Sequence, residues 1–138
     1  MKNFKTRPVS PSEEAAYWSR SDECWALATK AFEEGKRSGC AINVIHSVIA
    51  LADLICIRFS GRRYAGSSHD EAVDFYAKLP IQEDEFKKSV HRLGQIVALK
   101  THAEYGGSPI SEGDLSHMLK SAERFRSYAL SKLGKKPD

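Results

Sequence analysis

The chain has 138 residues, of which 41% are hydrophobic and 28% are charged, the composition of an ordinary globular protein. This length fits one domain over residues 1–138, with a core large enough to be stable without a metal or disulfides. The composition excludes long disordered or low-complexity segments. We expect a folded part at about 10–133 between flexible, basic ends at 1–9 and 134–138.

The net charge of +3 is concentrated at the two ends of the chain. Residues 1–9 and 132–138 contribute +5, which leaves −2 for residues 10–131. The folded part is therefore not basic as a whole. Basic ends are usually solvated tails, and nucleic-acid binding by them is the alternative.

The three cysteines indicate a reducing compartment. Cys24, Cys40 and Cys56 are odd in number and form no Cys-x-x-Cys pair. If Cys40 and Cys56 share a helix, they lie about 24 Å apart and cannot form a disulfide. With no recognisable signal peptide, we expect a cytoplasmic protein that needs no cofactor.

A first helix is predicted from Ser10 to about Lys36. Ser10 is a suitable N-cap, Pro11 fits the first helical position and Glu13 completes a capping box. The seven-residue spacing of Trp18, Trp25 and Phe32, with Leu27 beside them, predicts an apolar seam. The tight connection Arg37–Gly39 should make the next helix an antiparallel neighbour.

The segment Cys40–Ser60 is predicted to be the central helix, because it is apolar on most of its circumference. His46, Asp53 and Arg58 argue against a membrane span, so no membrane association is expected. A narrow polar stripe forms a second candidate cleft; its members are Asn43, His46, Ser47 and Asp53. Hydrogen-bonded core structure is the alternative for this stripe. No metal site is expected, since a further ligand at close spacing is missing.

Three more helices are predicted after a turn-rich loop at Gly61–Ser68. They are a short helix from His69 to about Leu79, a long helix from Gln82 to about Tyr105, and a last helix from a cap at Ser111 to about Leu133. No alternating strand pattern competes with them. The fold class is therefore all-α, an up-and-down bundle of about five helices, four long and one short.

The order of several short motifs resembles the HEPN domains, a family of small helical bundles. The matching pieces are Glu34-Gly35, the Ala- and Ile-rich Ala41–Leu54, Gly61-Arg62-Arg63, Ser68–Val73, Leu99–Tyr105 and Ala122–Phe125, spread over about residues 12–133. The resemblance implies an up-and-down bundle, often a homodimer, associated with nucleotide or RNA binding, toxin–antitoxin pairs or nuclease activity.

The arginine–histidine motif of the nuclease branch of that family is altered in this chain. Gln95, Ile96 and Val97 stand where an arginine should precede His102. Arg63 and His69 do have the right spacing, but they sit in the loop before the short helix. A ribonuclease using Arg63 as the phosphate-binding cation and His69 as the base is therefore one alternative.

The favoured function is a binding module, not an enzyme, for the phosphate of a nucleotide or nucleic acid. This hypothesis depends on the basic segment from Arg58 to His69 and on residues near the end of the fourth helix. The candidate ligand-binding residues are Arg58, Arg62, Arg63, Tyr64, His69, Lys100, His102 and Tyr105. The other alternative is a non-catalytic protein-interaction subunit, for example a toxin–antitoxin partner of a nucleotidyltransferase.

Overall fold

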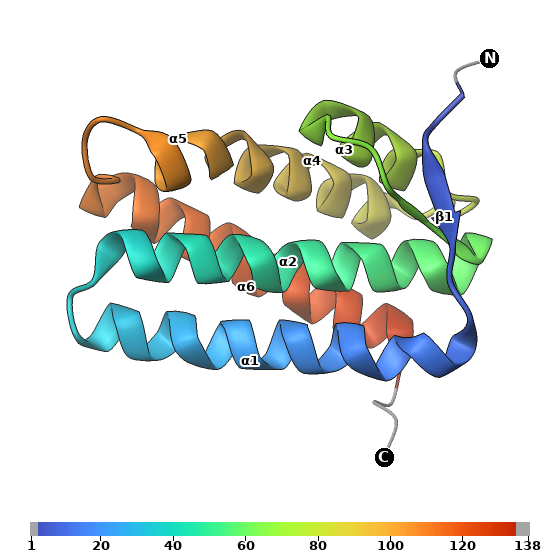
Figure 1. Cartoon of the computed structure of the whole chain (residues 1–138), viewed down its shortest axis with the longest axis horizontal. Helices are drawn as coiled ribbons and strands as arrows, with labels where there is room; N and C mark the ends of the chain where they lie inside the picture. Colours follow the sequence, from blue (N-terminus) through green and yellow to red (C-terminus); the bar gives the residue numbers. More distant parts are fainter. Residues whose placement is uncertain (1–2, 135–138) are drawn as a thin grey trace.

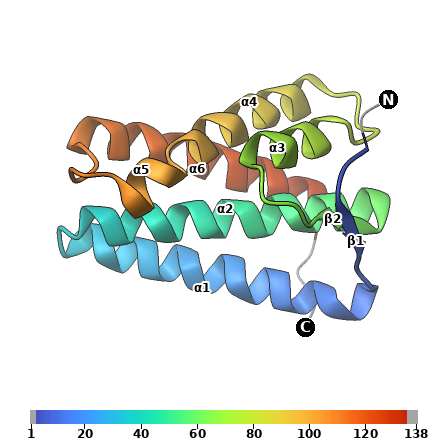
Figure 2. The ribbon, with the colours of Figure 1, turned by 45° about the horizontal axis from the view of Figure 1, so that its top comes forward.

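The structure of the chain is a computed structural model that describes residues 3–134. It is an α-helical bundle with a small antiparallel sheet of two strands at one end (Figures 1 and 2). The all-α prediction is therefore confirmed. The elements are β1 (Thr6–Pro8), the 3-10 turn η1 (Pro11–Glu13), α1 (Glu14–Glu33), α2 (Arg37–Ser60), β2 (Arg62–Tyr64), α3 (His69–Ala77), α4 (Asp84–Ala98), α5 (Lys100–Tyr105) and α6 (Glu112–Leu133).

Helix α2 is the centre of the bundle, as its sequence predicts. It packs against α1 on one side and α6 on another, while α3, α4 and α5 cover more of its surface (Figure 1). By length and composition α2 could cross a membrane, but 72% of its most apolar window is buried inside the bundle. The fully buried side chains on α2 include Val44, Ile45, Val48, Leu54 and Ile55.

The connection between α1 and α2 lies earlier than predicted. Helix α1 ends at Glu33, and Gly35 adopts a left-handed φ of 72°, which glycine allows without a steric penalty. The Gly35 and Lys36 amides donate to carbonyls of the last turn of α1, at Phe32 and Ala31. Arg37–Gly39 is therefore the first turn of α2 and not the loop; the glycine that ends α1 is Gly35.

The apolar seam of α1 is shorter than predicted. Trp18 is buried, but Phe32 and Leu27 are each 56% exposed. A strict seven-residue spacing turns by about 20° per heptad on a straight helix, so its third member rotates away from the core. The two exposed side chains leave an apolar area on the second half of α1.

Residues 6–8 form a strand, so the prediction of a flexible lead-in over residues 1–9 is wrong for this part. Strand β1 pairs with β2, Thr6 opposite Tyr64 and Pro8 opposite Arg62. Beyond the sheet, the Val9 amide donates to the Gly61 carbonyl. The prediction of no strands is corrected by the same pairing. Of the flexible end predicted at 134–138, residues 135–138 lie outside the described residues.

The predicted fourth helix is divided into α4 and α5 at Leu99. The Leu99 amide donates to the Ile96 carbonyl in a tighter turn, and α5 then begins at Lys100. The start signals of two other helices are confirmed. The side chains of Ser68 and Ser111 accept hydrogen bonds from the third amides of α3 and α6.

Candidate functional site

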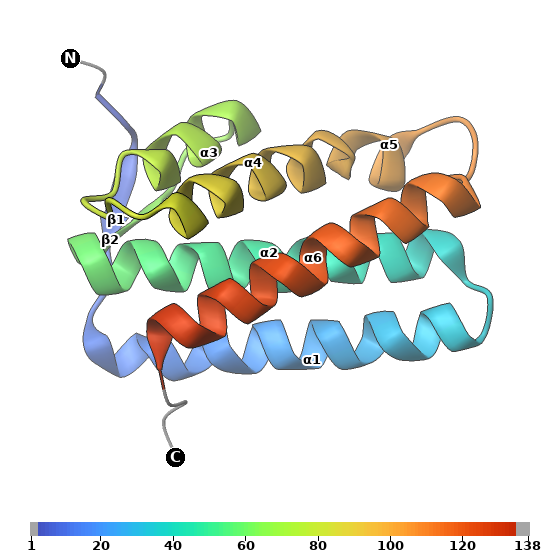
Figure 3. The same ribbon diagram turned by 180° about the vertical axis from the view of Figure 1, so that it is seen from behind.

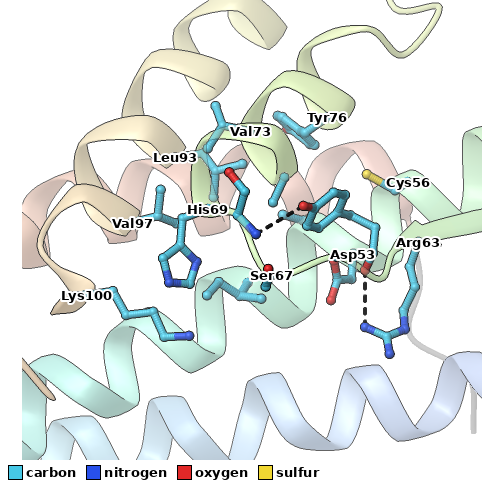
Figure 4. Close-up of a pocket in the computed structure, with 16 residues that line it drawn as sticks. Asp53, Cys56, Arg63, Ser67, His69, Val73, Tyr76, Leu93, Val97 and Lys100 are labelled. Carbon is cyan, nitrogen blue, oxygen red and sulfur yellow. Dashed lines mark hydrogen bonds between the residues drawn. The ribbon is translucent and has the colours of Figure 1, made fainter. Parts of the chain in front are cut away.

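A cavity of about 380 Å³ opens between α2, α3, α4 and the segment that follows β2 (Figure 4). One part of its wall is apolar and comes from α2, α3 and α4, with Ile49, Val73, Leu93 and Val97 as members. The polar part of the wall comes from α2, β2, the loop after β2, α3 and α5. Its residues include Asp53, Arg63, Ser67, His69 and Lys100.

Arg63 enters the cavity from strand β2. Its Nη1 atom donates to the Tyr64 carbonyl at 3.3 Å, while its Nε atom is buried and has no hydrogen-bond partner among the described residues. Buried polar atoms are normally paired, so this N–H is a donor without an acceptor. The pairing of Arg63 with Arg7 of β1 fixes the backbone from which the side chain extends.

Tyr64 braces the rim of the cavity. Its hydroxyl donates to Oε2 of Glu71 at 3.0 Å and accepts from the Ser68 amide at 3.1 Å. The Glu71 amide in turn donates to the Ser68 hydroxyl, at 3.2 Å. Tyr64 was predicted to contact a ligand; the structure shows that its hydroxyl holds the loop to the first turn of α3.

His69 and Lys100 reach the cavity from the first residues of two helices. His69 begins α3 and is exposed, whereas Lys100 begins α5 and is half-buried. In Figure 4 they lie on one side of the cavity, with Arg63 on the other side and Asp53 between. The helix break at Leu99 sets the direction in which the Lys100 backbone continues.

Asp53 is the carboxylate of this cavity. It is half-buried on α2, and no hydrogen bond or ion pair connects it to another residue within 3–134. Burial raises the pKa of Asp53 to about 6, and the positive charges of Arg63 and Arg20 oppose that rise. The site therefore contains a carboxylate that titrates just below neutral pH.

Four of the predicted ligand-binding residues lie away from the cavity. Arg58 donates to the Leu133 carbonyl at 2.9 Å and to Oε1 of Glu14 at 2.7 Å, so it ties α2 to α6 and α1. Arg62 points to the other face of β2 and donates to the Thr6 hydroxyl at 2.7 Å. His102 and Tyr105 do not line the cavity either, and Tyr105 is 80% exposed. The structure therefore does not bring these four residues to the cavity, and their part in ligand binding stays a prediction.

The polar stripe of α2 is not a single cleft. Ser47 is fully buried and donates to the Ser21 carbonyl at 2.8 Å, and Asn43 bonds to the Gly39 carbonyl of its own helix. His46 lies 3.6 Å from a carboxylate oxygen of Glu104 on α5. Asp53 is the one member of the stripe that lines the cavity, so the structure does not bring the four residues to one hollow.

Several cavity residues were not predicted. Leu93 and Val97 follow the ordinary apolar spacing of α4, which does not distinguish a cavity wall from packed core. Ser67 lies in a polar turn, and only the fold brings it to the cavity. The signal in the sequence for this region is the pair Arg63 and His69, which have five residues between them.

Within residues 3–134, no three His, Cys, Asp or Glu side chains are grouped so that they could hold a metal ion. No protein-family model and no curated protein matches this chain, so the resemblance to the HEPN domains and the expected homodimer both stay predictions.

Proposed function

We propose that the cavity binds a small phosphate-bearing molecule, such as a nucleotide. The observation that carries this proposal is the convergence of Arg63, His69 and Lys100 on one cavity from β2, α3 and α5. These residues belong to three different secondary-structure elements but line one cavity. Arginine and lysine are the side chains that most often bind phosphate, and a histidine adds a further donor.

The donor geometry of Arg63 supports an anionic ligand. Its buried Nε has no acceptor among the described residues, although an unpaired buried donor costs about 1–3 kcal/mol. The guanidinium as a whole lines the cavity, so a phosphate there would pair with its positive charge. Lys100, opposite Arg63 in Figure 4, would add a second positive charge on the same ligand.

The size and wall of the cavity support a ligand larger than phosphate alone. Its volume of about 380 Å³ lies within the ~300–1,000 Å³ range of small-molecule sites. Val73, Leu93 and Val97 offer an apolar surface that suits the face of a base. Asp53 offers an acceptor for an N–H or O–H group, which a base or a ribose carries.

Calorimetric titration of the purified chain with the four common nucleoside monophosphates, and with inorganic phosphate, tests this proposal. Arg63→Ala and Lys100→Ala should each weaken nucleotide binding about tenfold or more, because each removes a charge-assisted contact. Arg62→Ala is the matched control, since it removes the neighbouring arginine on the other face of β2. Equal affinities for the Arg63→Ala variant and the wild type would contradict the proposal.

A ribonuclease reaction is a second candidate, because Arg63 and His69 line the same cavity. In this reaction His69 would take the proton of the 2′-hydroxyl, whose oxygen bonds to the adjacent phosphorus while the bond from phosphorus to the 5′-oxygen breaks. The leaving 5′-oxygen would take a proton from water, and Arg63 would neutralise charge on the phosphate. Cleavage of an end-labelled RNA should then be lost in His69→Ala and Arg63→Ala and kept in Arg62→Ala. Cleavage that survives in the first two variants would remove this candidate.

A further inference from the structure

A shallow groove between α4 and α6 shares no lining residue with the cavity described above. Its volume is about 450 Å³. Its lining residues come from α4 and α6, two helices that pack against each other (Figure 3). Helix α4 contributes five side chains and helix α6 three. The lining residues are Lys87, Lys88, His91, Arg92 and Gln95 from α4 and His117, Ser121 and Arg124 from α6.

The helical repeat places these side chains on facing sides of the two helices. On α4, Lys87, His91 and Gln95 follow one another at intervals of four residues, which brings them to one side. On α6, His117, Ser121 and Arg124 have the same kind of spacing. Ser121 is 8% exposed and forms part of the floor, while the cations stand at the rim.

The groove is strongly positive, although the folded part of the chain is not. Four of its lining residues are Lys or Arg and two are His, with no Asp or Glu among them. Residues 10–131 carry a net charge of −2 in total. The concentration of cations on this face is therefore local, and it is not explained by a generally basic protein.

The nearest acidic side chains border the groove at one side. Glu85 pairs with Lys88 at 3.1 Å, and both side chains are about 60% exposed, so water screens this ion pair. Glu85 and Glu123 line an adjoining hollow that also contains Arg92 and Arg124. The groove itself thus has a basic centre, and both acidic and basic side chains lie at its border. The acidic ones would repel a polyanion and so limit how far it extends across α6.

We propose that this groove binds the phosphate backbone of a nucleic acid. From Lys87 to Gln95, α4 rises about 12 Å, which matches the rise of three to four nucleotides along the axis of a duplex at about 3.4 Å each. Lysine and arginine side chains at the rim would contact phosphates, and Gln95, the histidines and Ser121 would supply further hydrogen bonds. The groove has no exposed apolar anchor, whereas a protein interface normally has an apolar core, so a nucleic acid fits it better than an acidic protein segment.

Fluorescence anisotropy with a labelled single-stranded RNA of about 20 nucleotides tests the proposal. The variant Lys87→Ala/Arg124→Ala removes one cation from each side of the groove. The control Lys30→Ala/Lys78→Ala removes the same charge from exposed positions on α1 and just after α3. Both variants keep the basic ends of the chain, so binding by those ends affects the two measurements equally.

The groove variant should bind the RNA at least about tenfold more weakly than the wild type at low salt. The slope of log affinity against log salt concentration should fall by about 1.4, because each lost phosphate contact removes about 0.7 for a single strand. The control variant should stay within about twofold of the wild type, and both should melt at the wild-type temperature.

Three results would overturn the proposal. The first is an equal loss in the control variant, which would show that binding reflects net charge alone. The second is no binding of the RNA by the wild type at low salt. The third is binding of poly-glutamate in preference to the RNA, with the same sensitivity to Lys87 and Arg124, which would identify an acidic protein as the partner. Calorimetry should give the Lys87→Ala/Arg124→Ala variant the same nucleotide affinity as the wild type, because the groove and the cavity share no lining residue, so this test is separate from that of the cavity.

Discussion

Gly66 packs directly against the ring of Tyr64. A Cβ atom added at Gly66 would lie 2.5 Å from Cζ of Tyr64 and closer still to the hydroxyl oxygen. The ring cannot simply swing away, because its hydroxyl is bonded to Glu71 and to the Ser68 amide. Gly66 thus allows the loop to close over the tyrosine that holds the rim of the cavity.

Gly66→Ala should therefore destabilise the protein by about 1–3 kcal/mol, the usual cost of inserting atoms into a packed site. Urea denaturation gives the free energy of unfolding. Gly107→Ala is the matched control, since a Cβ there would meet no atom within 4 Å. If the two glycine variants have the same stability, Tyr64 moves freely and the rim is not held as described. The Gly66 variant should also bind the nucleotide less well, because Arg63 precedes Tyr64 on the same strand.

The helices could be predicted from the sequence because their signals are local. Capping side chains at Ser68 and Ser111 mark two helix starts, and the apolar circumference of α2 marks the centre of the bundle. The strands could not be predicted in this way. Each strand has only three residues, too few to show an alternating pattern. The paired residues Thr6 and Tyr64 are also far apart in the sequence, so no local signal indicates their pairing. Nothing in the residue types around Leu99 marks the division between α4 and α5.

The cavity was predictable only in part, for a geometric reason. The composition of the basic segment before α3 indicates a binding site for an anion, but the sequence does not show which of its arginines lines the cavity. In the structure Arg63 lines the cavity, whereas the side chain of Arg62 is bonded to Thr6. Asp53 was predicted in a stripe with Ser47, and the packing of α1 and α6 separates the two.

The raised pKa of Asp53 predicts a pH-dependent stability. Its pKa is about 6 in the folded protein against an ordinary value of 3.8, so the folded state binds the proton more tightly than the unfolded state. Stability therefore falls as the pH rises from about 4 through about 6, and the full cost, at most about 3 kcal/mol, is present above that range. Asp53→Asn removes this ionisation. It should be more stable than the wild type at pH 7.5, by about 1–3 kcal/mol, with little of this gain at pH 4.

Urea denaturation of the wild type and the Asp53→Asn variant at the two pH values measures this difference. Glu33→Gln, at an exposed position on α1, controls for the general effect of removing a negative charge. A gain of the same size at both pH values would contradict the prediction, because it would come from packing and not from ionisation. Nucleotide affinity of the Asp53 variant then reports separately whether the carboxylate accepts a hydrogen bond from the ligand.

Ser47 belongs to a buried network that holds three helices together, and it should affect stability without affecting the cavity. Nη1 of Arg126 on α6 donates to the hydroxyls of Ser21 on α1 and Ser47 on α2, both at 2.9 Å. The guanidinium also stacks on Trp25, 4.5 Å from its ring centre. One arginine therefore joins α6 to both members of the long helix pair.

Ser47→Ala should cost about 1–2 kcal/mol of unfolding free energy, since it removes a hydrogen bond to the Ser21 carbonyl and an acceptor for Arg126. Arg126→Met keeps most of the aliphatic stem and should cost about 1–3 kcal/mol through the lost charge-assisted bonds. The double variant should cost less than the two single variants together, by about 0.5 kcal/mol or more, because they remove one shared interaction. Strictly additive costs would show that Ser47 and Arg126 act independently. A loss of nucleotide binding in Ser47→Ala at unchanged stability would instead indicate a role for Ser47 in ligand binding, as the second candidate cleft predicted from the sequence implies.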